Sequence, residues 1–159
     1  MSKILALLHT QADGALPKAA LETVTAAAAL SKQLGGTLSV AVLGADAAAA
    51  ADAVAGCGAA AFLAVGGDAV AQPRYATDAA AATALIQASG AEIVLAPGTS
   101  RFARALPGAA HRAGAQIDTH VVAVSGEGGK VAAQRWFYRQ RILGSFSRAA
   151  RPWVLLVDG

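Results

Sequence analysis

The chain alternates short apolar runs with longer alanine-rich stretches. The apolar runs predict strands at residues 3–8, 37–43, 60–65, 92–96 and 120–124. The alanine-rich stretches predict helices near residues 17–34, 46–56, 76–89 and 100–113. Because strands that alternate with helices are typical of βαβ units, we expect an α/β fold with a mainly parallel sheet and helices on both faces.

Residues with capping properties mark the ends of the expected helices. They are Gly35-Gly36 at the end of the first helix, and Asp46, Thr77-Asp78 and Ser100 at the starts of the other three. Pro107 lies inside the fourth helical stretch and predicts an interruption there, because proline removes a backbone hydrogen bond.

The pattern changes after residue 120. Residues 125–129 predict a turn, and residues 130–146 lack a helical period and predict two strands or one long bent strand. Residues 152–157 predict a last apolar strand. We therefore expect the parallel part to finish in an antiparallel C-terminal extension. With no repeat or linker visible, residues 1–159 are predicted to form a single domain.

Composition narrows the class of protein. The 159 residues are 55% hydrophobic but only 5% aromatic, so alanine supplies most of the apolar content and favours close packing of helices on a sheet. The alanine tracts are broken by polar residues, which argues against a membrane span. The N-terminal apolar run is too short for a secretion signal, and Cys57 has no second cysteine to pair with. We therefore expect a cytoplasmic protein.

The net charge of +3 is concentrated near the C-terminus. From Gly126 onward the basic residues are Lys130, Arg135, Arg139, Arg141, Arg148 and Arg151, against Glu127 and Asp158. This part of the chain is where an acidic partner surface would dock.

A nucleotide pocket is one candidate site. In open α/β sheets, ligands bind beyond the carboxyl ends of the strands, here after Thr10 and around Gly98, Thr99, Ser100 and Arg101. The alternative is that Pro97-Gly98 forms a tight turn, Ser100 caps the helix and the arginines are solvated. Neither a Gly-x-Gly-x-x-Gly nor a Gly-Lys-Ser/Thr motif occurs, which favours the alternative.

Metal and catalytic sites receive little support. His9, His111 and His120 do not have ligand spacing, and no Gly-x-Ser-x-Gly motif occurs. The carboxylates considered, all expected at turns or helix ends, are Asp13, Glu22, Asp68, Asp78, Glu92 and Asp118. We therefore expect no metal and no catalysis by this chain alone.

Residues 134–143 interleave aromatic side chains with arginines, a pattern that can bind single-stranded nucleic acid. A half-buried strand is the simpler interpretation, because side chains alternate between its faces. Trp136, Tyr138 and Ile142 would then share one face, and Arg135, Arg139 and Arg141 would point to solvent or to an acidic partner.

The strand-turn-helix segment at residues 91–124, with its Leu95-Ala-Pro-Gly-Thr99 turn and later Leu106-Pro107, resembles the amino-terminal domain of the electron transfer flavoprotein alpha subunit. The opening strand, the Thr-containing alanine-rich helix after it and the strand at residues 37–43 are similar to the same family. The resemblance implies a Rossmann-like three-layer sandwich. One departure is that Arg139-Gln140 follow Tyr138, where the family has a small residue, Gly and Asn.

The resemblance also implies a function. The family transfers electrons between dehydrogenases and an acceptor, and this domain would be the structural part that holds a beta-type subunit or associates with itself. FAD is the family's cofactor, but it is held by a second domain that would follow residue 159, and AMP is held by the beta subunit. The resemblance therefore implies no principal cofactor ligand in this chain, whereas the rival interpretation is a small adenine-nucleotide-binding protein that uses Gly98, Thr99, Ser100 and Arg101.

Overall fold

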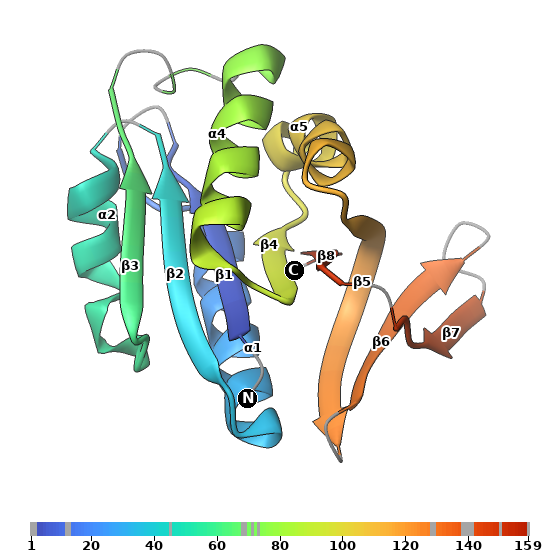
Figure 1. Cartoon of the computed structure of the whole chain (residues 1–159). Coiled ribbons are helices and arrows are strands. Elements are labelled where there is room, and N and C mark those ends of the chain that lie inside the picture. The colour runs from blue at the N-terminus through green and yellow to red at the C-terminus, as the bar shows by residue number, and fades with distance from the viewer. Residues whose placement is uncertain are drawn as a thin grey trace.

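The computed structural model describes residues 3–11, 14–44, 46–67, 70, 72, 74–127, 130–137, 142–149 and 151–158. It contains an eight-stranded sheet with the strand order β3-β2-β1-β4-β8-β5-β6-β7, shown in Figure 1. The strands are β1 (Lys3–His9), β2 (Thr37–Leu43), β3 (Ala61–Val65), β4 (Ile93–Pro97), β5 (Gln116–Glu127), β6 (Lys130–Phe137), β7 (Ile142–Phe146) and β8 (Trp153–Val157). The helices are α1 (Lys18–Leu34), α2 (Ala47–Ala53), the short 3-10 helix η1 (Ala55–Cys57), α4 (Tyr75–Ser89) and α5 (Ser100–Arg112).

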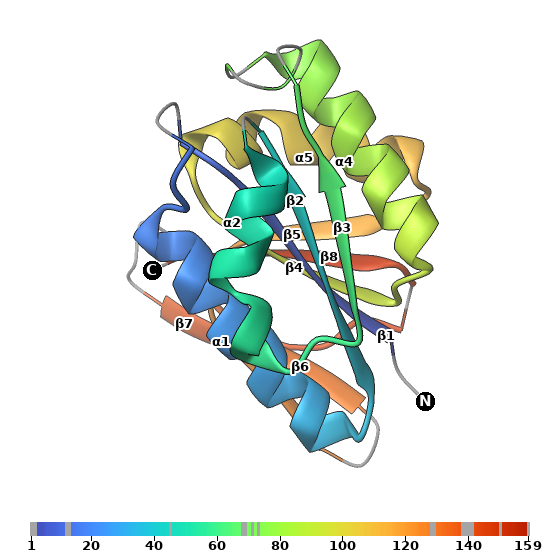
Figure 2. The ribbon, with the colours of Figure 1, turned by 90° about the vertical axis from the view of Figure 1, so that its left-hand side faces the viewer.

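Helices cover the parallel strands on both faces. Helices α1 and α2 lie on one side of the sheet and α4 on the other, as Figure 2 shows. Along β1, Ile4 and Leu8 belong to the core under α1, whereas Leu5 and Leu7 belong to the core under α4 and α5. A strand buried on both faces is apolar at every position, which explains the continuous apolar runs in the sequence. The predicted Rossmann-like three-layer sandwich is confirmed.

The C-terminal extension is only partly antiparallel. Strand β6 pairs antiparallel with β5 and with β7, as predicted for this region. Strand β8, however, returns to the middle of the sheet and pairs in parallel with both β4 and β5. Residues 153–156 are buried, and such a fully apolar run is stable only where the sheet is covered on both sides.

Strand β5 changes partner along its length. Its first residues pair with β8 and its last with β6, and the register shifts between Asp118 and Val121. Within this bulge His120 has a φ of 57°. The predicted strand therefore begins earlier than residue 120, at Gln116. Later in β5, Gly126 lies so close to Leu34 of α1 that an added Cβ would be 2.6 Å from a methyl carbon of that leucine.

Several predicted helix boundaries are confirmed and others are wrong. Gly35 ends α1 in the left-handed conformation, as predicted. Asp46 precedes α2, but its side chain makes no capping hydrogen bond. Thr99, not Ser100, caps α5, and it accepts a hydrogen bond from the Phe102 amide. Pro107 does not interrupt α5, which runs through to Arg112.

Asp78 has a different role from the predicted cap. Helix α4 begins at Tyr75, so Asp78 lies in its first turn, where its carboxylate is buried. In the described part of the chain, no helix is long and apolar enough to cross a bilayer.

Candidate functional site

The carboxyl ends of β1 and β4 meet where the strand order reverses, as the sequence predicts. Strand β1 pairs in parallel with β2 on one side and β4 on the other. Helices α1 and α5 leave these two strands on opposite faces of the sheet, so the polar residues at the strand ends, His9, Thr10 and residues 98–100, share one edge.

His9 and Thr99 are bonded to each other at this edge. The His9 Nδ1–H donates to the Thr10 carbonyl at 3.0 Å, so Nε2 accepts from the Thr99 hydroxyl at 2.7 Å. The Thr99 oxygen in turn accepts from the Phe102 amide at 3.4 Å, and the Phe102 ring packs edge-on against His9 with ring centroids 4.6 Å apart.

Burial is the main reason that the pKa of His9 lies below its usual value. The hydrogen bond to Thr10 raises this pKa, the charge of Arg101 lowers it and that of Asp78 raises it. The imidazole is therefore neutral near pH 7, as its bond to the Thr99 hydroxyl requires.

Arg101 is buried and paired with Asp78. Its Nε and Nη2 each donate to an Asp78 carboxylate oxygen at 2.8 Å. Nη2 also donates to the Val70 carbonyl at 2.7 Å, and Nη1 to the Thr10 carbonyl at 3.4 Å. The side chains of Arg101 and Asp78 are only 6% and 2% exposed. The expectation of a solvated arginine is therefore wrong here, because this guanidinium links α5 to α4 and to the end of β1.

The turn after β4 lies against a carboxylate. The Gly98 amide donates to the Val157 carbonyl at 2.8 Å, and an added Cβ on Gly98 would be 2.6 Å from an Asp158 carboxylate oxygen. The other oxygen of Asp158 lies 3.3 Å from His120 Nδ1. Gly98 and Ser100 are exposed, but a negative group beside the turn opposes a bound phosphate. Of the residues predicted to bind a nucleotide, Gly98, Thr99 and Arg101 thus contact other parts of the protein.

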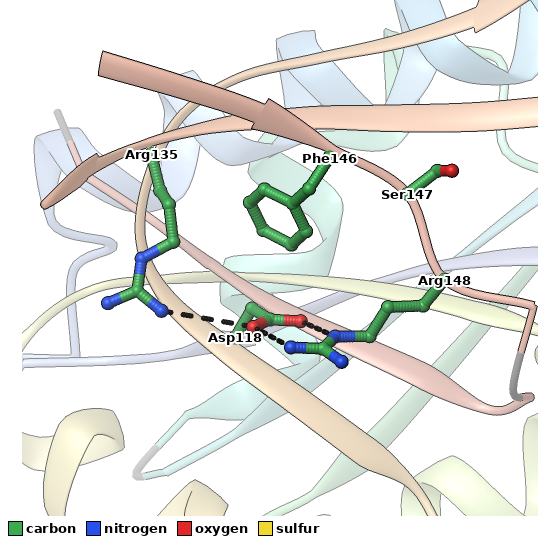
Figure 3. Close-up of a pocket in the computed structure, with 5 residues that line it drawn as sticks. All are labelled: Asp118, Arg135, Phe146, Ser147 and Arg148. Carbon is green, nitrogen blue, oxygen red and sulfur yellow. Dashed lines mark hydrogen bonds and ion pairs between the residues drawn. The ribbon is translucent and has the colours of Figure 1, made fainter. Parts of the chain in front are cut away.

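A second polar cluster surrounds Asp118 in β5, as shown in Figure 3. Arg148 donates from Nε at 2.5 Å and from Nη2 at 2.9 Å to the two carboxylate oxygens of Asp118. The indole N–H of Trp153 donates to the same carboxylate at 2.8 Å. Arg135 Nη1 lies 3.8 Å from it on the opposite side from Arg148. Asp118 thereby ties β8 and the connection before it to β5.

Several opposing effects act on the pKa of Asp118. Burial alone would raise it, but hydrogen bonds from Arg148 and Trp153, together with the charges of Arg148 and Arg135, hold it below its usual value. The hydrogen bond to Asp118 and the negative charge of Asp118 raise the pKa of Arg148. Asp118 is therefore ionised at neutral pH although its side chain is only 3% exposed.

Two adjoining cavities open beside this cluster. The first, of about 250 Å³, is lined by Asp118, Arg135, Phe146, Ser147 and Arg148. The second, of about 400 Å³, is lined by Lys130, Val131, Ser147, Arg148, Ala149 and Arg151. Ser147 and Arg148 line both cavities, which are therefore neighbours, and the two together are called here the basic groove.

The sequence did not predict the Asp118 cluster. Asp118 was expected at a turn, but it lies within β5. Arg135 was expected to point to solvent or to an acidic partner, but it points to Asp118 of the same chain. A carboxylate inside an otherwise apolar strand is the signal that could have indicated a buried partner. The side chain of Trp136 and residues 138–141 lie outside the described residues, and Ile142 is 53% exposed.

The remaining candidates stay apart. Among the described residues, no three His, Cys, Asp or Glu side chains are grouped so that they could hold a metal ion. His111 is exposed on α5 and His120 lies at the β5 bulge. In the described part of the chain, the three histidines are therefore not grouped as metal ligands.

Comparison with known protein families decides the identity of the chain. The electron transfer flavoprotein domain matches residues 4–159, almost the whole sequence. The chain belongs to the electron transfer flavoprotein family. Members of this family are electron carriers, and the match supports an electron transfer flavoprotein-like role for this chain. A search of curated proteins gave no match.

Proposed function

We propose that this electron transfer flavoprotein domain is of the alpha amino-terminal type, a structural domain that holds a beta-type subunit rather than a flavin. The observation that supports this role best is the closed carboxyl edge of the sheet. There the Arg101 guanidinium is used by Asp78 and by two backbone carbonyls, and the Thr99 hydroxyl by His9. The use of these side chains within the protein supports a scaffold role, although the buried Thr10 hydroxyl at the same edge has no hydrogen-bond partner among the described residues.

The proposal includes the cofactor and the partner. FAD belongs to the family, and we propose that this chain alone does not retain it, because its main binding domain is not among these residues. Residues 1–159 would form one domain of a heterodimeric carrier, with self-association as the alternative. A cytoplasmic location, expected from the single cysteine, is part of the same proposal.

The partner is tested by mixing the purified chain with a beta-type electron transfer flavoprotein subunit of the same organism. Size-exclusion chromatography with light scattering should show a one-to-one complex, and the chain alone should be colourless above 350 nm, where flavin absorbs. The proposal would be contradicted if the chain stayed monomeric and did not bind the beta-type subunit. A stoichiometric flavin spectrum of the chain alone would also contradict it.

Binding of AMP distinguishes the alpha type from the beta type and from a nucleotide-binding protein. A ligand present at 100 times its dissociation constant stabilises a protein by about 2.7 kcal/mol, which a thermal melt detects readily. We expect AMP, ATP and FAD to leave the melting temperature unchanged. The contacts of Gly98, Thr99 and Arg101 within the protein do not favour the nucleotide alternative, which stays a prediction from the sequence.

A further inference from the structure

The basic groove carries a concentrated positive charge. Among the described residues that line it, four are cationic, Lys130, Arg135, Arg148 and Arg151, and one is a carboxylate, Asp118. That carboxylate is buried between Arg135 and Arg148, and its one negative charge offsets the charge of at most one arginine. The groove therefore presents an excess of positive charge to whatever enters it.

Two of these arginines are held in place by the fold. Arg148 uses Nε and Nη2 for Asp118, while its side chain is 43% exposed. Arg151 donates from Nη1 to the Arg148 carbonyl at 2.6 Å, and its guanidinium lies 5.9 Å from the centre of the Trp153 ring. A guanidinium that is already fixed loses little conformational entropy when it binds a carboxylate.

We propose that the basic groove is a docking site for an acidic segment of a partner protein, whose Asp or Glu carboxylates pair with Lys130, Arg148 and Arg151. This inference rests on the proposed function, in which the domain holds a protein partner. The two neighbouring cavities, of about 250 and 400 Å³, place cationic side chains at more than one point, so several carboxylates of one peptide segment can be paired, whereas a single phosphate would use only part of the groove.

A second copy of the chain fits the groove less well. The chain carries a net charge of +3, so two copies repel each other. Two of its carboxylates, Asp78 and Asp118, are also buried in ion pairs and cannot meet a neighbouring molecule. Charge complementarity thus favours a different, acidic protein.

The test uses a fluorescein-labelled peptide of twelve alternating Glu and Ala residues, with fluorescence anisotropy measured on the full chain at low salt. The groove variant is Lys130→Gln with Arg151→Gln, which changes none of the side chains that are bonded to Asp118. The matched control is Lys18→Gln with Arg112→Gln, which removes the same charge from exposed positions on α1 and α5. Thermal melts check that both variants are folded. If the double groove variant has a lowered melting temperature, Lys130→Gln alone is used in its place.

We expect the groove variant to raise the peptide's dissociation constant about tenfold or more and the control variant to raise it by less than about twofold. Equal losses in both variants, or no binding by the native chain, would overturn the proposal. Displacement of the peptide by inorganic phosphate at equal ionic strength would also overturn the proposal. The proposal would likewise be wrong if a single-stranded DNA dodecamer bound more tightly than the peptide and the groove variant lost this DNA binding.

The beta-type subunit serves as a separate arm of the experiment. If that subunit does not bind but the peptide result holds, the proposed function is wrong and the acidic docking site is supported. If the subunit binds the native chain and the groove variant equally while the peptide binds neither, the docking site is wrong and the proposed function stands.

Discussion

The structure contains two arginine–carboxylate clusters with different surroundings. In the Arg101–Asp78 pair, both side chains are buried and the remaining guanidinium bonds go to backbone carbonyls. In the Asp118 cluster the carboxylate is equally buried, but Arg148 is 43% and Arg135 25% exposed. An arginine–carboxylate pair therefore has no charge accessible to solvent at Arg101–Asp78, whereas the arginines of the Asp118 cluster remain partly accessible.

The difference follows from the elements that carry each cluster. Asp78 and Arg101 lie on the adjacent helices α4 and α5, which pack on the parallel strands. Arg135 and Arg148 lie on β6 and in the connection after β7, beyond the last helices in Figure 1. An arginine between two packed helices must satisfy all its bonds internally, whereas one at the sheet margin can also bind a partner.

The largest effect is expected from Arg101→Leu. This change leaves the Asp78 carboxylate buried without its partner, and the loss of one member of a buried pair costs about 3–5 kcal/mol. Chemical denaturation should show this loss, and Asp78→Asn added to Arg101→Leu should recover part of it. A loss below about 1 kcal/mol would contradict the prediction that the Arg101–Asp78 pair is buried and stabilises the contact between α4 and α5.

A smaller effect is expected from Asp118→Asn, because Arg148 can turn to water when its carboxylate is removed. We expect a loss of about 1–2 kcal/mol at pH 7, reduced from the value for a fully buried pair by the exposure of Arg148. A loss as large as that of Arg101→Leu, measured in the same denaturant series, would remove the contrast between the two clusters.

The loss caused by Asp118→Asn should depend on pH. The pKa of Asp118 is lower in the folded protein than in the unfolded chain, so the unfolded chain binds more protons as the solution becomes acidic. The native protein should exceed Asp118→Asn in free energy of unfolding by the full amount above about pH 4. This difference should disappear as the pH falls through the lowered pKa of Asp118. A difference between native protein and variant that stays constant from pH 6 to pH 2 would contradict an ionised Asp118.

Thr99→Ala and Ser100→Ala separate the cap from its neighbour at the closed edge. Thr99 accepts from the Phe102 amide and contacts His9, so its replacement should cost about 1 kcal/mol. Ser100 is exposed, so its replacement should change the free energy of unfolding by less than about 0.5 kcal/mol. Equal losses of stability for the two variants, measured in paired thermal melts, would contradict Thr99 as the cap.

The smallest effect is expected from the titration of His9. Its pKa is lower in the folded protein than in the unfolded chain, so stability from the neutral imidazole is complete above about pH 6.5 and falls as the solution becomes more acidic. The native protein should lose stability from pH 7 to pH 5 more steeply than His9→Gln. Parallel slopes for the two proteins would show that His9 is not held neutral.

Local patterns in the sequence determined the alternating elements, the parallel sheet and the edge at which His9 meets the turn at Gly98. The periodicity of apolar residues and the glycine that ends α1 act over a few residues, so they can be interpreted without knowing what lies nearby. The resemblance carried by the strand-turn-helix segment likewise depends on contiguous residues, and the family is confirmed.

Only the tertiary structure decided where β8 lies and which carboxylate each arginine meets. The apolar run of β8 predicts a strand, but its place between β4 and β5 depends on strand order, which no local pattern encodes. Arg101 lies 23 residues from Asp78, and Arg148 lies 30 residues from Asp118. An arginine and an aspartate far apart in sequence become a buried pair or a docking groove only when packing sets their distance and their access to water.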